Sequence, residues 1–284
     1  MEASYMQFQC LVLDFDGTFT DVEQEAAPFF GAYREQLCGE LGPGADRSWD
    51  EAYARIEQAP ADFGWEYDGR IVAPSQADPY IRATAIAQIL LEDYGYDPAG
   101  RSDLLENLYR SNYEKSHTVF RPEARDVAEA LLALETPVFV VTNSHTDAVQ
   151  KKIESLAPKG LEKLTLFGNA KKYVVAEAED RDSRFDGLPE STSVDGLSRP
   201  ILLRRGRYYE LLREIWTRTA TSPEGMLVCG DIFELDLAMP AALGAHVHLV
   251  TRAGTPEYEV RAARNHPRGA TSEDLSGLLT RLGL

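Results

Sequence analysis

Short apolar runs alternate with amphipathic stretches over much of the chain. Predominantly apolar runs of strand length lie at residues 8–13, 138–141, 164–167, 226–229 and 245–250. Runs of this kind predict strands that are buried on both faces, as in a parallel sheet. Stretches with helical spacing separate several of them, so we expect strand–helix–strand units with right-handed crossovers. The pattern therefore predicts an α/β fold with a Rossmann-like parallel sheet core. Its helices are expected at 122–134, about 146–156, 208–217, 235–243 and near 274–282.

The segment after the first strand has no sustained strand pattern. Apolar positions there recur at helical spacing, for example at Phe29, Tyr33 and Leu37. Helices are expected at 23–38, 48–58, 79–94 and 102–115, with an irregular stretch from 60 to 79. The chain is thus predicted to have two domains: an α/β core domain of residues 1–20 and 120–284, and a mostly helical cap domain of residues 21–119.

The link from residue 168 to residue 200 has a weaker pattern. Its middle is rich in charged residues, and apolar runs at 173–175 and 201–203 flank it. A solvated loop and a β-hairpin excursion both fit this composition. We expect the excursion, because structureless loops of this length are uncommon in compact domains.

The composition is that of a globular protein with an unusually acidic balance. The formal net charge is −17 over 284 residues. Such a surface repels nucleic acid and anionic membranes, so we expect neither as a partner. The three cysteines, Cys10, Cys38 and Cys229, show no metal-ligand spacing, and Cys10 and Cys229 lie inside apolar runs. With no signal-peptide pattern at the start, we expect a cytoplasmic protein that is a monomer or a homodimer.

Two acids follow the first predicted strand. The strand leads into Asp14, Phe15, Asp16, Gly17 and Thr18. If the strand ends at Asp14 and the chain turns at Gly17, the two carboxylates can approach one bound atom from different directions. Oxygen ligands of this kind suit a hard cation, and a carboxylate can also act as a nucleophile or as an acid and base. The alternative is a strand-ending turn in which both acids only cap backbone amides.

Polar residues also follow two later strands. Thr142 and Asn143 come after the run at 138–141, and Asp231 and Asp236 come after the run at 226–229. In parallel sheets, groups at the carboxyl ends of strands gather at one edge, which is where such sheets bind ligands. Ordinary helix capping is the alternative for each of these residues.

The three strand ends together resemble the motifs of the haloacid dehalogenase (HAD) superfamily. The matching stretches are Asp14–Thr20 (DFDGTFT), Val140–Asn143 (VVTN) and Val228–Asp236 (VCGDIFELD), in the order that the family has. The resemblance covers the core from about 8 to 20 and from 121 to 250. It implies a hydrolase with an α/β core, and the helical segment at 21–119 lies where many HAD proteins carry a cap.

The resemblance also implies roles for the acids. Asp14 would be the nucleophile that becomes phosphorylated, and Asp16 would be the general acid and base. Mg²⁺ would be bound by Asp14, Asp231 and Asp236, with the backbone carbonyl of Asp16. HAD dehalogenases lack the second acid, since a halide leaves without a proton, so Asp16 favours phosphoryl chemistry. Thr142 and Asn143 would bind or orient the phosphoryl group.

The chain departs from the family at the third motif. HAD phosphatases usually carry a lysine shortly before the helix that leads to the last acidic motif, but residues 203–209 (LRRGRYY) contain none. An arginine can bind phosphate in two-point fashion, so we expect Arg205, or failing it Arg207, to bind the substrate. Lys171 and Lys172 lie earlier in the chain and are expected to be solvated.

These observations predict a Mg²⁺-dependent phosphatase that hydrolyses a small phosphorylated metabolite through an aspartyl-phosphate. Two alternatives stay open. One is a phosphomutase on the same scaffold, which would differ in whether the cap excludes water. The other is a catalytically silent HAD-like binding protein, which the missing lysine makes conceivable.

Overall fold

The computed structural model describes residues 8–284, and this part of the chain folds into two compact units. The core unit contains residues 8–21 together with Phe120–Gly196 and Pro200–Leu284. The cap unit contains Val22–Val119 and, in addition, the short segment Leu197–Arg199. That segment was not expected in the cap. It is held there because the Ser198 hydroxyl donates to the Ala61 carbonyl at 2.8 Å.

The core unit is built on a parallel sheet, which has six strands within the described residues, in the order β10-β9-β8-β1-β4-β5. The strands are β1 (Cys10–Leu13), β4 (Val138–Val141), β5 (Leu164–Phe167), β8 (Met226–Gly230), β9 (His246–Val250) and β10 (Gly269–Ser272). Every residue of β1, β4, β8 and β9 is buried, whereas the edge strands β5 and β10 are half-buried. Strands covered on both faces explain the predominantly apolar runs in the sequence.

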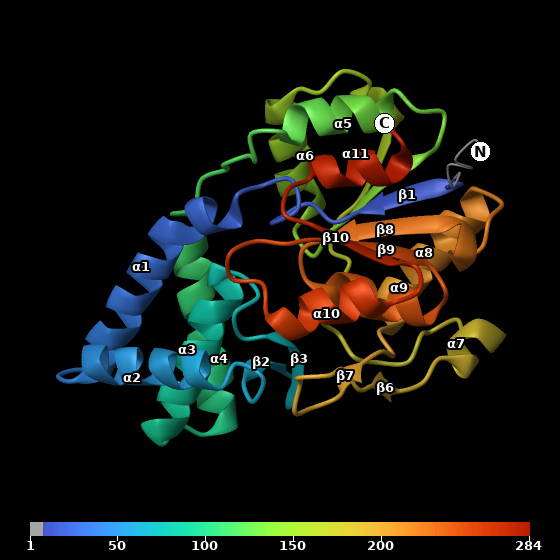
Figure 1. Cartoon of the computed structure of the whole chain (residues 1–284). Helices are drawn as coiled ribbons and strands as arrows, with labels where there is room; N and C mark the ends of the chain where they lie inside the picture. Colours follow the sequence, from blue (N-terminus) through green and yellow to red (C-terminus); the bar gives the residue numbers. More distant parts are fainter. Residues whose placement is uncertain (1–7) are drawn as a thin grey trace. The chain divides into compact units, whose positions relative to one another are not determined.

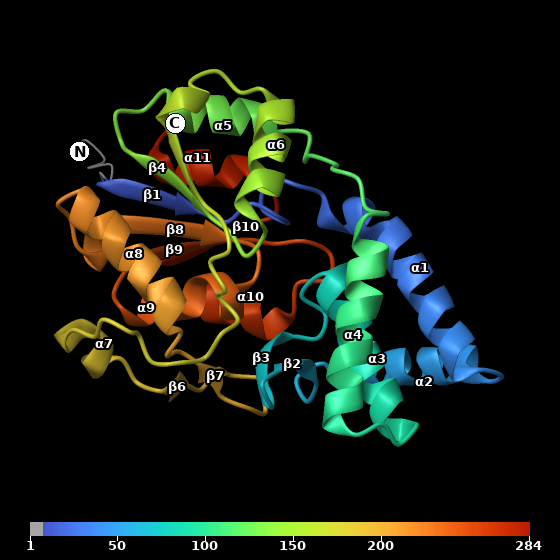
Figure 2. The ribbon, with the colours of Figure 1, turned by 180° about the vertical axis from the view of Figure 1, so that it is seen from behind.

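Helices cover both faces of this sheet. Helices α5 (Ala124–Leu132), α6 (Thr146–Leu156) and α11 (Ser276–Leu282) lie on one face. The opposite face carries α8 (Gly206–Arg218), α9 (Ala238–Ala242) and α10 (Glu257–Asn265), and the view from behind shows the same two layers (Figures 1 and 2). The predicted α/β fold with a Rossmann-like parallel sheet is confirmed.

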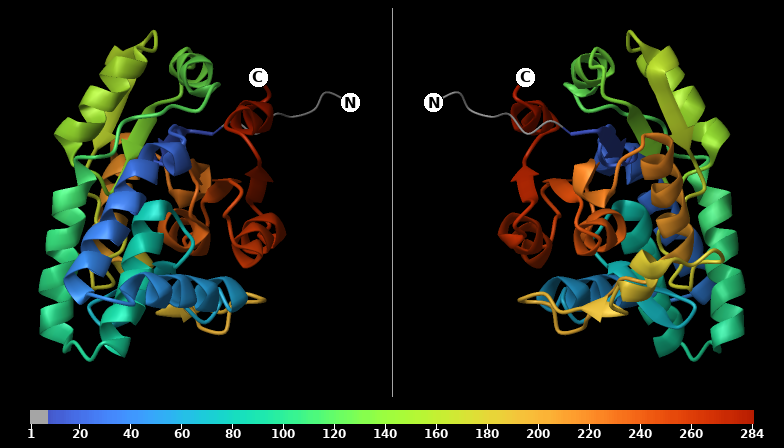
Figure 3. Two further views of the ribbon diagram at one scale, coloured as in Figure 1. Left: turned by 90° about the vertical axis from the view of Figure 1, so that its left-hand side faces the viewer. Right: turned by 90° about the vertical axis from the view of Figure 1, so that its right-hand side faces the viewer.

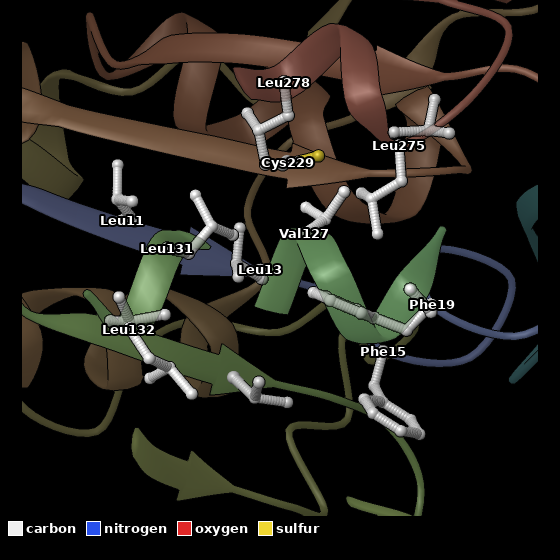
Figure 4. Close-up of a cluster of buried hydrophobic side chains, with 14 of the residues drawn as sticks. Leu11, Leu13, Phe15, Phe19, Val127, Leu131, Leu132, Cys229, Leu275 and Leu278 are labelled. Atoms are coloured by element: carbon white, nitrogen blue, oxygen red, sulfur yellow. The ribbon is translucent and has the colours of Figure 1, made fainter. Parts of the chain in front are cut away.

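Alternate residues of the central strands form the core under α5 and α11. Leu11 and Leu13 of β1 and Cys229 of β8 face Val127 and Leu131 of α5, as Figure 4 shows. Each of these side chains is at most 1% exposed. Burying one large aliphatic side chain contributes about 2 kcal/mol, so this layer fixes β1 and β8 next to each other. The adjacent ends of these two strands carry Asp14 and Asp231.

The link between β5 and α8 contains a short excursion, as expected. It includes α7 (Ser183–Gly187) and a two-stranded antiparallel pair of β6 (Ser191–Thr192) with β7 (Ile201–Leu202). Downstream, the prediction of a single closing helix was incomplete. Helix α10 and strand β10 also lie in the tail, and β10 extends the sheet beside β9.

The cap unit is mostly helical, with one β-hairpin. Its helices are α1 (Val22–Leu41), α2 (Ala45–Gln58), α3 (Pro79–Asp93) and α4 (Pro98–Tyr113), the blue to green helices in the side views of Figure 3. They pack around a buried aromatic cluster that includes Phe29, Tyr33 and Trp49. The stretch expected to be irregular forms the hairpin of β2 (Gly64–Tyr67) and β3 (Arg70–Pro74). Within the described chain no helix is long and apolar enough to cross a membrane.

Candidate active site

The ends of β1 and β8 bring two predicted acids together. The Asp14 amide donates to the Cys229 carbonyl at 2.8 Å, which extends the strand pairing to the first acid. Gly17 then turns the chain with φ +84°, and a Cβ there would lie 2.3 Å from Oδ2 of Asp231. Only glycine satisfies both conditions at this position. The Gly17 carbonyl is fixed by Nη2 of Arg121 at 2.9 Å.

Asp236 joins these acids through a π-helical turn at Phe233–Leu237. Within this turn the Asp236 amide donates to the Ile232 carbonyl at 2.9 Å, and the Ile232 amide donates to Oδ2 of Asp236 at 3.1 Å. The Tyr208 hydroxyl donates to the Asp236 carbonyl at 2.9 Å. A Cβ on Gly230 would lie 2.6 Å from Cβ of Asp236, so this glycine allows the acid to fold back over the strand end.

Asp14, Asp231 and Asp236 form a buried group of carboxylates. One carboxylate oxygen from each lies within 4.8 Å of the others, and the three residues are between 2% and 9% exposed. Burial raises the pKa of the Asp14 carboxyl well above its usual range, and the neighbouring acids add to this, while the Lys172 ammonium opposes it. Three carboxylates packed this closely repel one another, so the site needs positive charge.

Lys172 supplies that charge, and the expectation that it would be solvated was wrong. Its Nζ lies 2.7 Å from Oδ1 of Asp14 and 2.8 Å from Oδ1 of Asp236, and its side chain is 1% exposed. Burial alone would lower the pKa of Lys172, but Asp14 and Asp236 outweigh it and raise the pKa. The ammonium therefore stays charged between the two carboxylates. Its neighbour Lys171 is exposed, as predicted.

Neither arginine predicted to bind substrate supplies this cation. Arg205 is buried, but its guanidinium donates to the backbone carbonyls of Leu202 at 3.0 Å and Lys172 at 2.5 Å. Its guanidinium therefore binds the main chain at Lys172 and Leu202. Arg207 lies on α8 with a side chain that is 52% exposed, 3.7 Å from Glu210. Arg205 and Arg207 were predicted from their position along the chain. The cation beside the acids is instead Lys172, from the loop at 168–172.

Thr142 and Asn143, at the end of β4, hold the loop that carries Lys172. The Asn143 side-chain oxygen accepts from the Lys172 amide at 2.7 Å, and the Thr142 carbonyl accepts from the Ala170 amide at 2.9 Å. Asn169 and Lys171 have φ values of 53° and 48°, so the loop is tightly turned. Asn143 therefore positions the lysine.

Asp16 lies apart from the three buried acids. Its Oδ1 accepts from Nζ of Lys152 at 2.7 Å and its Oδ2 accepts from the Ser144 hydroxyl at 2.6 Å. The Thr142 hydroxyl lies 3.5 Å from the same Oδ2. Lys152 and Ser144 were not predicted as site residues. In the sequence, Lys152 is distinguished only by its place in the helix after β4, next to the apolar Ile153, which is buried.

Comparison with solved structures identifies the fold. YfnB from Bacillus subtilis, described as a HAD-hydrolase and solved with magnesium bound, shares 16% sequence identity with this chain at a TM-score of 0.54, covering 98% of this chain and 100% of that one. A haloacid dehalogenase-like hydrolase from Bacteroides fragilis gives 15% identity, a TM-score of 0.54, and 96% and 100% coverage. The chain has the HAD fold. The resemblance seen in the motifs is thereby confirmed at the level of the fold.

Other HAD-fold structures give the same result. A predicted phosphoglycolate phosphatase from Haemophilus somnus 129pt is 13% identical with a TM-score of 0.52, and the match covers 96% of this chain and 97% of that one. No protein-family model and no curated protein matches the sequence. The HAD fold is therefore recognised from the three-dimensional structure and from a few short motifs, while the overall sequence identity to these structures is 13–16%.

The HAD core of this chain adds a second cation beside the acids. Nε of Arg252 lies 3.0 Å from Oδ2 of Asp231, and both side chains are at most 8% exposed. Behind this pair, the Glu234 amide donates to Oε1 of Glu259 at 2.9 Å. Burial raises the pKa of Glu259 to about 8, and its contact fixes the π-helical turn from outside. Three acids, one lysine and one arginine thus form a charged cluster that the surrounding main chain holds rigidly.

Proposed function

We propose that this protein is a Mg²⁺-dependent phosphatase that hydrolyses a small phosphomonoester through an aspartyl-phosphate on Asp14. The observation that carries the proposal is the Lys172 ammonium between Asp14 and Asp236, at 2.7 and 2.8 Å. It fixes a carboxylate as a nucleophile at a strand end and leaves positive charge where a phosphoryl group would arrive. One of the HAD-fold structures is described as a predicted phosphoglycolate phosphatase, which agrees with this proposal.

The acid group fits a magnesium ion. Its donors are carboxylate oxygens within 4.8 Å of one another, which is the donor type that Mg²⁺ prefers. Gly17 and Gly230 leave open the space that a Cβ would fill against Asp231 and Asp236. Asp14, Asp231 and Asp236 would hold the ion, with the Asp16 backbone carbonyl. When bound, Mg²⁺ would neutralise charge on the phosphoryl oxygens.

In the first step, a carboxylate oxygen of Asp14 attacks phosphorus. The bond between phosphorus and the ester oxygen breaks, its electron pair goes to that oxygen, and a proton from Asp16 converts it to the free alcohol. Lys172 keeps the Asp14 carboxylate in place during the attack. Removing this nucleophile removes the reaction path.

In the second step, water attacks the phosphorus of the aspartyl-phosphate. The water gives a proton to the Asp16 carboxylate, and the bond between phosphorus and the Asp14 oxygen breaks. The electron pair returns to the Asp14 carboxylate, and inorganic phosphate leaves. Both residues end in their starting protonation states, so the cycle balances.

The presence of Asp16 favours ester hydrolysis over dehalogenation. An alcohol is a poor leaving group unless it receives a proton, whereas a halide leaves without one. The reason for considering a silent binding protein was the missing lysine at 203–209, and Lys172 removes that reason. A phosphomutase stays as the second candidate, since it would use the same two acids.

A phosphate-release screen tests the proposal. Purified protein with Mg²⁺ is assayed against sugar phosphates, nucleotides and phosphorylated acids, beside the variants Asp14→Asn and Asp126→Asn. The second is a matched control, because Asp126 is exposed on α5. We expect Asp14→Asn to lose turnover and keep its circular dichroism spectrum, and Asp126→Asn to behave as wild type. Activity retained in Asp14→Asn would overturn the proposal, and a phosphosugar isomer in place of phosphate would favour the mutase.

A further inference from the structure

The Asp16 carboxylate is held by two close donors from outside its own loop, and the Thr142 hydroxyl makes a longer contact at 3.5 Å. The Lys152 ammonium lies 2.7 Å from Oδ1, and the Ser144 hydroxyl lies 2.6 Å from Oδ2. Each oxygen of the acid therefore has its own charged or polar partner. Both contacts are partly buried, with side-chain exposures of 13% for Lys152 and 22% for Asp16.

The donors are themselves fixed by the fold. Lys152 lies on α6, whose residues Val149 and Ile153 are buried in the core cluster. The Ser144 amide donates to the Thr142 hydroxyl at 3.2 Å, and the Ser144 carbonyl accepts from the Asn169 amide at 2.8 Å. The main chain from which each donor extends is therefore held by the core or by hydrogen bonds.

We infer that Lys152 and Ser144 are positioning residues for the general acid, because together they fix the carboxylate of Asp16 through one close contact to each of its oxygens. This inference rests on the proposed function. An acid that gives its proton to a leaving oxygen must lie within hydrogen-bond distance of that oxygen, and a loosely held carboxylate would spend little time there. The Lys152 ammonium and the Ser144 hydroxyl act through Asp16, so their loss affects the step in which the ester oxygen needs a proton.

The consequence is a selective dependence on the leaving group. Phenyl phosphate and 4-nitrophenyl phosphate are close in size, but 4-nitrophenolate leaves readily without a proton and phenolate does not. The value of kcat/KM reports the step that forms the aspartyl-phosphate, in which Asp16 acts as the acid. A residue that positions Asp16 should therefore affect phenyl phosphate far more than 4-nitrophenyl phosphate.

The test compares Lys152→Met, Ser144→Ala, Asp16→Asn and the matched control Lys151→Met, which changes an exposed lysine one residue away. For Lys152→Met we expect kcat/KM to fall about 10- to 100-fold with phenyl phosphate and less than about threefold with 4-nitrophenyl phosphate. Ser144→Ala should show the same selectivity with a smaller loss. Lys151→Met should match wild type with both esters.

A double-mutant cycle separates positioning from a general structural effect. In the Asp16→Asn background, Lys152→Met should cause no further loss with phenyl phosphate, because the residue through which it acts is no longer an acid. A crystal structure of Lys152→Met should show the Asp16 side chain in a new orientation or in several, with Lys172 still between Asp14 and Asp236.

Three results would contradict the inference. They are an equal loss with both esters in Lys152→Met and Ser144→Ala, additive losses in the double mutant, and an Asp16 side chain unchanged in the variant's structure. Each comparison requires a wild-type protein that hydrolyses both esters. These three results therefore contradict the positioning role and leave the proposed function standing. A wild type that hydrolyses neither of these esters nor any compound of the phosphate-release screen would overturn the proposed function and this inference with it.

Discussion

Two loops bring charge to the buried site, and they are held in different ways. The turn that carries Asp236 has hydrogen bonds of its own. Tyr208 and Glu259 add one contact each from outside the turn. The Asp236 amide donates to the Ile232 carbonyl at 2.9 Å, and the Ile232 amide donates to the Asp236 carboxylate at 3.1 Å. Its acids are therefore close in sequence to the groups that orient them. The short motif at 228–236 therefore contains Asp236 together with Ile232, which bonds it.

The loop at 168–172 is stabilised from elsewhere. Asn143 accepts from the Lys172 amide, the Ser144 carbonyl accepts from the Asn169 amide, and Arg205 donates to the Lys172 carbonyl. The acids that Lys172 contacts, Asp14 and Asp236, are 158 and 64 residues away along the chain. A site residue that is oriented by neighbours in the sequence can be predicted from a short motif. A site residue that is positioned by contacts far along the chain cannot.

The strongest test of this contrast is removal of the lysine. In Lys172→Met the carboxylates of Asp14 and Asp236 lose their buried ammonium, so we expect a loss of activity of at least about 1,000-fold. Leaving two buried carboxylates without their partner should also lower the free energy of unfolding by about 3–5 kcal/mol. Steady-state kinetics and denaturant titration measure the two effects.

The matched control for that variant is Lys171→Met. Lys171 is exposed and carries the same charge one residue earlier. We expect wild-type kinetics and stability from it. Equal losses in both lysine variants would show that the loop, rather than the buried ammonium, determines the effect.

Gly230→Ala tests the π-helical turn at Phe233–Leu237, which carries Asp236. The added Cβ would lie 2.6 Å from Cβ of Asp236, so the turn must shift or the strand end must move. We expect the free energy of unfolding to fall by about 1–3 kcal/mol, with a large loss of activity because Asp236 is displaced. Thermal unfolding and kinetics check this, and an unaffected variant would show that the turn is more adaptable than its hydrogen bonds indicate.

Asn143→Ala tests the loop that is held from outside. It removes the acceptor for the Lys172 amide and leaves the lysine side chain intact. We expect kcat/KM to fall about 10- to 100-fold, because the ammonium is less well positioned. Asn169→Gly is the control, since Asn169 is exposed with φ 53° and glycine adopts that conformation readily. Wild-type activity in Asn143→Ala would remove its positioning role.

The smallest expected effect concerns Glu259, the outside support of the turn. Burial raises the pKa of this carboxyl to about 8 from 4.5, so between these values the folded protein binds a proton that the unfolded chain does not. The contribution of Glu259 to the free energy of unfolding therefore falls as pH rises, by about 1 kcal/mol per pH unit between pH 6 and pH 7. Glu259→Gln should remove that component in denaturant titrations at the two pH values. An identical pH dependence in the variant would contradict the assignment.

The sequence predicted the sheet well, for a physical reason. Strands buried on both faces are mostly apolar, as β4 is, and β4 begins and ends where its run does. The run at 164–167 also matches the bounds of β5, although this edge strand is half-buried and contains Thr165. Strand β10 (GATS) has no apolar run because it lies half-buried at the edge, and the hairpin β2–β3 is half-exposed or exposed over most of its length. Both were missed since their pairing partners, rather than their own composition, make them strands.

Within the site, the sequence identified the acids but not the basic groups. Asp14, Asp231 and Asp236 follow apolar strands directly, and strand ends of one sheet meet. Lys172 looked like a surface lysine because the turned conformation at Asn169 and Lys171 that buries it leaves no periodic pattern. Arg205 was expected to bind substrate, whereas its hydrogen bonds to backbone carbonyls depend on the folded chain and leave no trace in the sequence.

Trapping of the phosphorylated residue tests the central claim most directly. Protein turning over 4-nitrophenyl phosphate with Mg²⁺ is quenched in acid, reduced with borohydride and digested, and the peptide that contains Asp14 and Asp16 is sequenced by mass spectrometry. A phosphorylated aspartate becomes homoserine under these conditions, and we predict that change at Asp14 alone. Homoserine at Asp16 or at another residue, or its absence during steady turnover, would contradict the account.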